Sequence, residues 1–134
     1  MNASAIVLTA VLLVTMVEGN QGRRAQEGAR QRAPESFACD RNNLTVYTGV
    51  VRTYRRQTGS TTVSIRTDYD TTEQVSLTHA GTDDPSRFFR WQGEPFTPAD
   101  WNRIESRKGV LREGTRASAW VCADGRVMVD WGVQ

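Results

Sequence analysis

Alternating polarity in two neighbouring segments is the feature that most constrains this chain. In residues 61–67 the apolar Val63 and Ile65 alternate with polar side chains, and residues 73–79 repeat the pattern with Val75 and Leu77. A period of two on both sides of a turn is typical of adjacent strands in a sheet with one buried face. The sequence therefore predicts a mainly β fold built around this hairpin.

Three further segments are predicted to be strands. Residues 44–56 are rich in Val, Thr and Tyr, and the internal Gly49 indicates a bulge or a sharp bend. Residues 115–122 and 126–132 flank a turn that contains Asp124-Gly125. Asp-Gly between alternating runs is a strong hairpin signal. The last two strands should therefore pair with each other.

A helix is predicted over residues 98–107, after a long, turn-rich connection at residues 80–96. Thr97 is a suitable N-cap, and Asp100 three residues later completes a capping box with Asp in place of Glu. Gly109 follows the segment, as expected beyond a helix C-terminus. We therefore expect about three turns of helix between the third and fourth strands.

The N-terminal apolar run, residues 5–17, indicates the compartment. It is too short for a bilayer-spanning helix, which needs about 20 apolar residues, but it fits a signal-peptide core. We expect residues 1–19 to be a cleaved signal peptide and the protein to be secreted or periplasmic. The alternatives are an uncleaved membrane anchor, the one case in which a membrane would be a partner, and a buried helix.

Residues 20–36 separate this run from the strands. They contain no aromatic or branched aliphatic side chain, so they cannot bury enough apolar surface to offset the entropy of ordering. We expect a disordered linker at residues 20–36 and a folded domain at residues 37–134.

Cys39 and Cys122 are the two cysteines of the chain. An even pair in an exported protein usually forms a disulfide, and closing so long a loop is worth roughly 4–5 kcal/mol in the chain-entropy model. The alternative is two separate buried thiols. The spacing is not that of a catalytic C-x-x-C dithiol.

The order of three strands, a helix and two strands resembles the oligonucleotide/oligosaccharide-binding (OB) fold. The resemblance covers residues 44–131, with the bent first strand at Tyr47-Thr48-Gly49-Val50-Val51 and the leucine, charged pair and glycine of residues 111–116 before the fourth strand. It implies a small five-stranded barrel with one helix between strands three and four. Antiparallel pairing of strands one and four would also bring Cys39 near Cys122. Another small barrel or an α+β sheet is the alternative.

The charge balance does not favour nucleic acid as the partner. Five of the 17 basic and four of the 15 acidic residues precede Leu44, which leaves 12 and 11 in the expected domain. Nucleic-acid-binding domains generally have a much stronger basic surface. The domain is therefore expected to be nearly neutral.

A local arginine and tyrosine surface is nevertheless a candidate binding site. Its residues lie on the first strand and on the next hairpin, where OB folds commonly bind ligands: Arg52, Tyr54, Arg55, Arg56, Arg66 and Tyr69. Arginine beside tyrosine can hold a base or a sugar by stacking. The alternative is that these are ordinary outward positions of strands.

No metal site, cofactor or catalytic group is expected. Asp68, Asp70 and Glu73 lie within six residues but lack the spacing of a complete calcium loop, so we interpret them as a solvated turn. The single histidine, His79, ends a strand and is expected to be structural. Without a Ser/His/Asp or Cys/His set, the chain is not expected to be an enzyme.

Trp120 shares a strand face with Ser118 and Cys122. It is therefore either an exposed contact for a partner or packed under the connection at residues 80–96. Taken together, the sequence predicts an exported, non-catalytic binding or accessory module whose partner is a protein or a cell-envelope glycan. The alternative is an OB domain that binds nucleic acid or another anionic polymer. No sequence signal indicates an oligomeric state.

Overall fold

A computed structural model describes residues 33–134, which form one compact unit. The predicted signal peptide at residues 1–19, and the predicted linker as far as residue 32, lie outside the described residues. No helix within residues 33–134 is long and apolar enough to cross a membrane.

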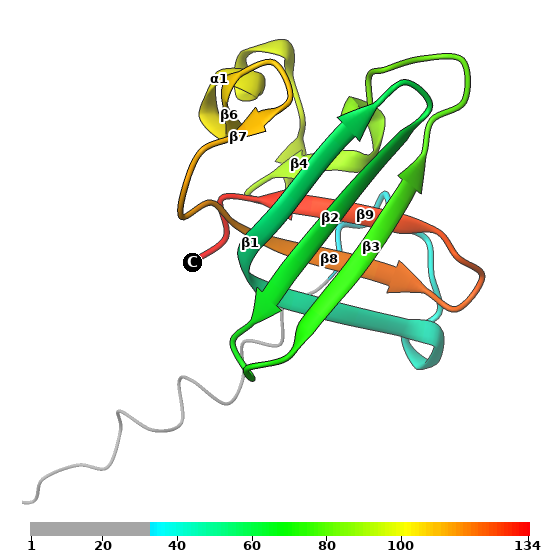
Figure 1. Cartoon of the computed structure of the whole chain (residues 1–134). Coiled ribbons are helices and arrows are strands. Elements are labelled where there is room, and N and C mark those ends of the chain that lie inside the picture. The colour runs from blue at the N-terminus through cyan, green and yellow to red at the C-terminus, as the bar shows by residue number, and fades with distance from the viewer. Residues whose placement is uncertain (1–32) are drawn as a thin grey trace, which may run out of the picture. The chain divides into compact units, whose positions relative to one another are not determined.

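The described chain is mainly β (Figure 1). One sheet has seven strands in the order β3-β2-β1-β8-β9-β4-β5, and a separate hairpin pairs β6 with β7. The strands are β1 (Leu44–Gln57), β2 (Ser60–Thr67), β3 (Thr72–Thr78), β4 (Phe89–Trp91), β5 (Glu94–Pro95), β6 (Glu105–Arg107), β7 (Val110–Leu111), β8 (Arg116–Cys122) and β9 (Val127–Trp131). The helical turns are η1 (Arg41–Asn43), η2 (Ser86–Phe88), η3 (Pro98–Asp100) and α1 (Trp101–Ile104).

The five predicted strands are present as β1, β2, β3, β8 and β9, and the predicted hairpin turn at Asp124-Gly125 joins the last two. The strand number was wrong, because the sheet is a seven-stranded one and not a closed five-stranded barrel. The additional strands come from the connection at residues 80–96. There Phe89 and Trp91 are in register with Val129 and Trp131 on the otherwise free edge of β9.

The predicted helix is much shorter than expected. Its start is correct, because the Thr97 backbone N–H donates to Asp100 Oδ2 at 2.7 Å and the capping box is complete. Only the turns η3 and α1 follow, and the chain becomes extended at Glu105, whose buried carboxylate contacts β1. Gly109 therefore does not end a helix. With φ of +80° it makes the tight turn between β6 and β7.

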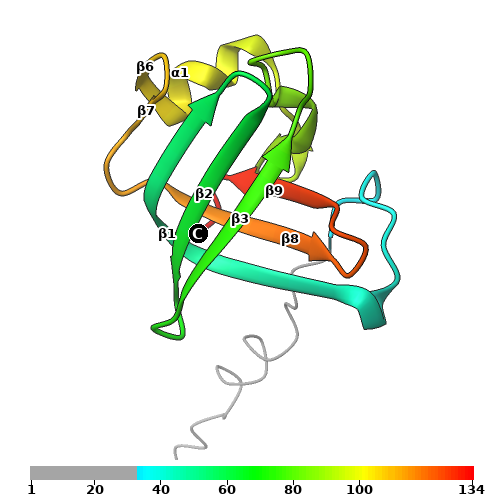
Figure 2. The ribbon, with the colours of Figure 1, turned by 45° about the vertical axis from the view of Figure 1, so that its right-hand side comes forward.

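Strand β1 bends as Gly49 predicted (Figure 2). Its first half pairs with β8, its second half pairs with β2, and Gly49 belongs to both ladders. A Cβ atom at Gly49 would lie 2.0 Å from the Arg66 carbonyl oxygen, so only glycine fits. A bulge between Val51 and Thr53 then interrupts the pairing with β2.

Two apolar clusters lie on opposite faces of β8. The larger one fills the space inside the curved sheet and includes Val63, Ile65, Phe89 and Trp131. On the other face, Trp120 packs with Phe37, Cys122 and Met128. Trp120 is only 3% exposed, so the interpretation as an exposed contact was wrong. Its cover is the segment around Phe37, whereas the sequence suggested residues 80–96.

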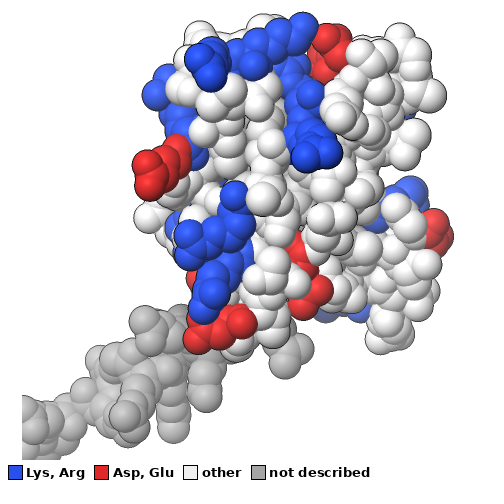
Figure 3. Space-filling model, in the orientation of Figure 1, with Lys and Arg blue, Asp and Glu red and all other residues white. Residues whose placement is uncertain are grey.

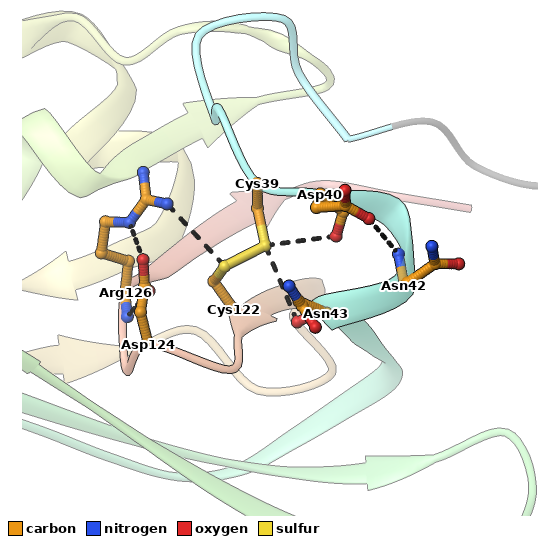
Figure 4. The surroundings of a disulfide bond; sticks show 7 residues. All are labelled: Cys39, Asp40, Asn42, Asn43, Cys122, Asp124 and Arg126. Carbon is orange, nitrogen blue, oxygen red and sulfur yellow. Dashed lines mark hydrogen bonds and ion pairs between the residues drawn. A yellow bond between two sulfur atoms is a disulfide. The ribbon is translucent and has the colours of Figure 1, made fainter.

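The predicted disulfide between Cys39 and Cys122 is confirmed, and the alternative of two free thiols is wrong (Figure 4). The Cα atoms are 6.0 Å apart, because the register that pairs Leu44 with Cys122 brings the start of β1 beside the end of β8. Asp40 Oδ1 accepts from the Asn42 N–H at 2.8 Å and caps the turn that leads from Cys39 into β1. A structural disulfide is compatible with an oxidising, exported compartment.

Candidate binding surface

The outer face of β1, β2 and β3 is a polar sheet surface. Inward positions of these strands build the core, and the alternate positions point away from it. Beside the second half of β1, the accessible outward side chains include four that carry hydroxyl or amide groups: Thr53, Thr62, Gln74 and Ser76. The face therefore offers hydrogen-bond donors and acceptors without a large apolar patch.

A groove crosses this face. It is lined by Arg52, Thr53, Tyr54, Arg55, Thr62 and Gln74. Arg52 and Arg55 are exposed, and neither side chain forms an ion pair or a hydrogen bond with another described residue. By contrast, six other basic side chains of residues 33–134 are paired with Asp or Glu. The groove therefore contains two guanidinium groups whose donors are free for a ligand.

Arg52 also connects this groove with a neighbouring one. The second groove runs between β1 and the β7 side of the small hairpin, and its lining includes Val51, Leu111 and Arg112. The bulge beside Val51 leaves Arg52 unpaired in the β1–β2 ladder. Consequently Arg52 contributes to both grooves.

The side chains of Tyr54 and Arg56 turn to the other face of the same strand, although Tyr54 also lines the groove. The Tyr54 hydroxyl donates to Glu105 Oε1 at 2.7 Å, and Arg56 Nη2 donates to Glu105 Oε2 at 2.8 Å. Glu105 Oε2 also accepts from the Gly109 N–H at 3.0 Å. The Arg56 guanidinium lies 4.2 Å from the ring centroid of Trp101. These contacts give both predicted site residues an internal partner.

The same cluster shifts the ionisation of Tyr54. Burial of the ring, reinforced by the hydrogen bond to the Glu105 carboxylate and its negative charge, raises the pKa of Tyr54 far above its usual value. Sequence reasoning missed Glu105 because it fell inside the predicted helix at residues 98–107. Nothing in a helical pattern indicates that a carboxylate there would be buried against β1.

Arg66 and Tyr69 lie at the far end of the face, at the β2–β3 hairpin. Arg66 Nη2 donates to Asp70 Oδ1 at 2.9 Å. Arg116 Nη1 and Nη2 donate to the two carboxylate oxygens of Asp68 at 3.0 and 2.7 Å. The hydrogen bonds from Arg116 lower the pKa of Asp68. Tyr69 between these pairs is 91% exposed. The structure therefore divides the predicted surface into a groove, a buried cluster and a hairpin tip.

The residues weighed as metal ligands have other contacts. Asp68 and Asp70 each face an arginine, and no group of three His, Cys, Asp or Glu side chains within residues 33–134 is arranged to hold a metal ion. His79 is fully buried: its Nδ1 donates to the Thr82 carbonyl at 2.8 Å, so Nε2 accepts from the Thr61 hydroxyl at 2.9 Å. Both ring nitrogens therefore hold the β3 end of the sheet in place.

The comparisons with known proteins add no family to this geometry. No protein-family model matches the chain, and no curated protein or solved structure matches it. Function therefore has to be argued from the surface itself.

Proposed function

We propose that this domain is an exported, non-catalytic binding module that holds an acidic glycan of the cell envelope on the outer face of β1, β2 and β3. The observation that carries the proposal is that the side chains of Arg52 and Arg55 have no partner among residues 33–134 and lie in a groove whose other side chains are mainly hydroxyl and amide groups. The expected signal peptide of the chain agrees with it.

The groove chemistry fits a ligand that carries both anionic groups and hydroxyls. A guanidinium group binds a carboxylate or a sulfate through two parallel hydrogen bonds. Thr53, Thr62 and Gln74 can both donate to and accept from sugar hydroxyls. A uronic acid or a sulfated sugar has both kinds of group, whereas a neutral glycan would leave the two guanidinium groups without an anion.

The topology supports an OB-type interpretation of this face. The strands β3-β2-β1-β8-β9 are neighbours in that order, β3 also contacts β9, and the helical turn α1 lies between β3 and β8 in the chain. OB folds bind oligonucleotides and oligosaccharides on the face of their second and third strands. The disulfide supports an exported location.

A glycan fits the groove better than a single-stranded nucleic acid does. Proteins that bind single strands stack bases on accessible aromatic rings. The aromatic side chain at this groove, Tyr54, has its hydroxyl on Glu105 and its ring edge-to-face with Trp131 at 5.8 Å. The groove therefore offers charge and hydrogen bonds, but its one ring is already packed inside.

The test is calorimetric titration of the full-length, disulfide-bonded protein at low and high salt. The probes are polygalacturonate, alginate, a sulfated glycosaminoglycan, uncharged dextran and an oligothymidylate. We expect an acidic polysaccharide to bind, and the double variant Arg52→Gln/Arg55→Gln to weaken its affinity at least tenfold, because each lost charged hydrogen bond is worth about 1.5–3 kcal/mol.

Arg107→Gln is the matched control, because Arg107 is exposed and unpaired among the described residues but does not line this groove. It should leave the affinity unchanged. The proposal fails if no acidic polysaccharide binds at low salt, or if the double variant binds as tightly as the wild type. Preferential binding of oligothymidylate would replace the glycan with a nucleic acid.

A further inference from the structure

The tip of the β2–β3 hairpin presents one aromatic ring to solvent. Tyr69 is 91% exposed, and it is the single aromatic side chain among the large exposed apolar residues of the described chain. Isolated exposed apolar residues are common and need no explanation by themselves. The loop that carries Tyr69 is what distinguishes it.

That loop is held by hydrogen bonds within it and by an ion pair on each side of Tyr69. Thr67 Oγ1 accepts from the backbone N–H groups of Tyr69 and Thr71, at 3.3 and 3.2 Å, and the Thr67 N–H donates to the Thr71 carbonyl at 2.8 Å. Asp68 is tied to Arg116 of β8, and Asp70 is tied to Arg66 of β2. A ring on a preorganised loop loses little conformational entropy when a ligand covers it.

The surroundings of the ring favour a sugar. Both arginines at the tip are already neutralised by Asp68 and Asp70, so the charge of any ligand contributes little to binding there, and the exposed ring is the main group left to contact it. An apolar protein pocket would have to desolvate both charged pairs. A pyranose has a C–H face that can cover an aromatic ring, and its hydroxyls can use the remaining N–H donors and carboxylate lone pairs.

The tip and the groove belong to one continuous face. Thr62 of the groove and Arg66 of the tip are both on β2, four residues apart, which corresponds to about 13 Å. The side chain between them on the same face is Ser64. Figure 3 shows a basic area near each end of these strands, with mostly uncharged surface between them and acidic side chains beside both areas. A ligand that reaches both ends must be a chain of several sugar units.

We propose that Tyr69 and its flanking Arg–Asp pairs form a second subsite, at which the ring stacks on a pyranose of the same acidic glycan that the groove binds. The inference rests on the proposed function. It adds that the ligand is an extended polymer and that its distant units are recognised by stacking, with little dependence on charge.

The experiment is a length series of oligogalacturonides, from the disaccharide to the decasaccharide, titrated into the full-length protein. Tyr69→Ala should weaken binding of the longest oligomers about tenfold, the loss expected for one stacked ring, and should leave binding of the shortest unchanged. Tyr69→Phe should bind like the wild type at every length, because it keeps the ring. The exposed position makes both variants suitable, and their melting temperatures should match that of the wild type.

Each outcome separates the inference from the proposed function. Equal affinities of Tyr69→Ala and the wild type at every length overturn the second subsite but leave the groove. An equal loss for short and long oligomers also overturns it, since the tip would then be part of a single small site. If the wild type binds none of the acidic polysaccharides tested for the groove, the proposed function falls and the inference falls with it. If it binds one other than polygalacturonate, the length series uses oligomers of that polysaccharide, with the same outcomes.

Discussion

Strand β1 uses the same residue types for opposite purposes on its two faces. Arg52 and Arg55 are exposed and have no side-chain partner in the described part of the chain, whereas Tyr54 and Arg56 turn inward and share the Glu105 carboxylate. All four lie within five positions of the chain. The residue type at each position is therefore a poor guide to the role of that side chain. Strand alternation and one bulge decide which guanidinium groups can meet a ligand and which hold the fold together.

The two faces differ in what a substitution should cost. Glu105 is 5% exposed and the Arg56 side chain 10%, so a change on the inner face leaves a charge buried without its partner. Within residues 33–134, the side chains of Arg52 and Arg55 have no partner to lose. Substitutions on the inner face should therefore change stability, and those on the outer face should change binding.

The largest expected effect is that of Glu105→Ala on the inner face. The variant removes the acceptor for Tyr54, Arg56 and the Gly109 N–H together, and breaking a buried ion pair on one side typically costs about 3–5 kcal/mol. Urea unfolding with the disulfide intact should report the loss. A change of less than about 1 kcal/mol would show that the inner cluster behaves like an ordinary surface ion pair, and the contrast between the faces would disappear.

Tyr54→Phe should have a smaller effect, about 1–3 kcal/mol, because it removes one hydrogen bond and leaves a buried acceptor. The variant also has a pH signature. Because the folded pKa of Tyr54 is raised, its contribution to stability is complete below the unfolded value of about 10 and is lost as the pH rises above it.

Unfolding free energies at pH 8 and pH 11 measure this signature directly. The wild type should lose more stability over that interval than Tyr54→Phe does. Tyr69→Phe is the control, since its exposed phenol should ionise alike in the folded and unfolded states. Equal losses of unfolding free energy in the wild type and in Tyr54→Phe would contradict the buried environment assigned to Tyr54.

Local pattern predicted the parts of this fold that depend on neighbouring residues. Alternation at Val63 and Ile65 located a buried strand face, Gly49 located the bend, and Asp124-Gly125 located the final hairpin. In each case the residues that carry the pattern lie in the same segment whose structure they determine. The Cys39–Cys122 bond was also predictable, because the chain has only two cysteines to pair.

Contacts between distant segments were not predictable in this way. Residues 105–107 have a helical context in sequence, yet Glu105 leaves the helix to meet Tyr54 and Arg56 from β1. Phe89 and Trp91 became a strand because the β9 edge was available to them. Trp120 is buried because the disulfide and Phe37 cover the outer face of β8. The predicted arginine and tyrosine surface is divided for the same reason. Contacts with Glu105, a distant residue in the chain, hold Tyr54 and Arg56 inside, and the sequence does not indicate these contacts.

The smallest expected effect on stability is that of the double variant Arg52→Gln/Arg55→Gln. Exposed side chains without partners usually contribute within about 0.5 kcal/mol, so its urea midpoint should match that of the wild type. The same variant should lose at least tenfold in affinity for an acidic polysaccharide. A destabilisation comparable to that of Tyr54→Phe would show that the outer arginines also support the fold. Unchanged stability together with weakened binding would show that the outer face of β1 serves binding and the inner face serves stability.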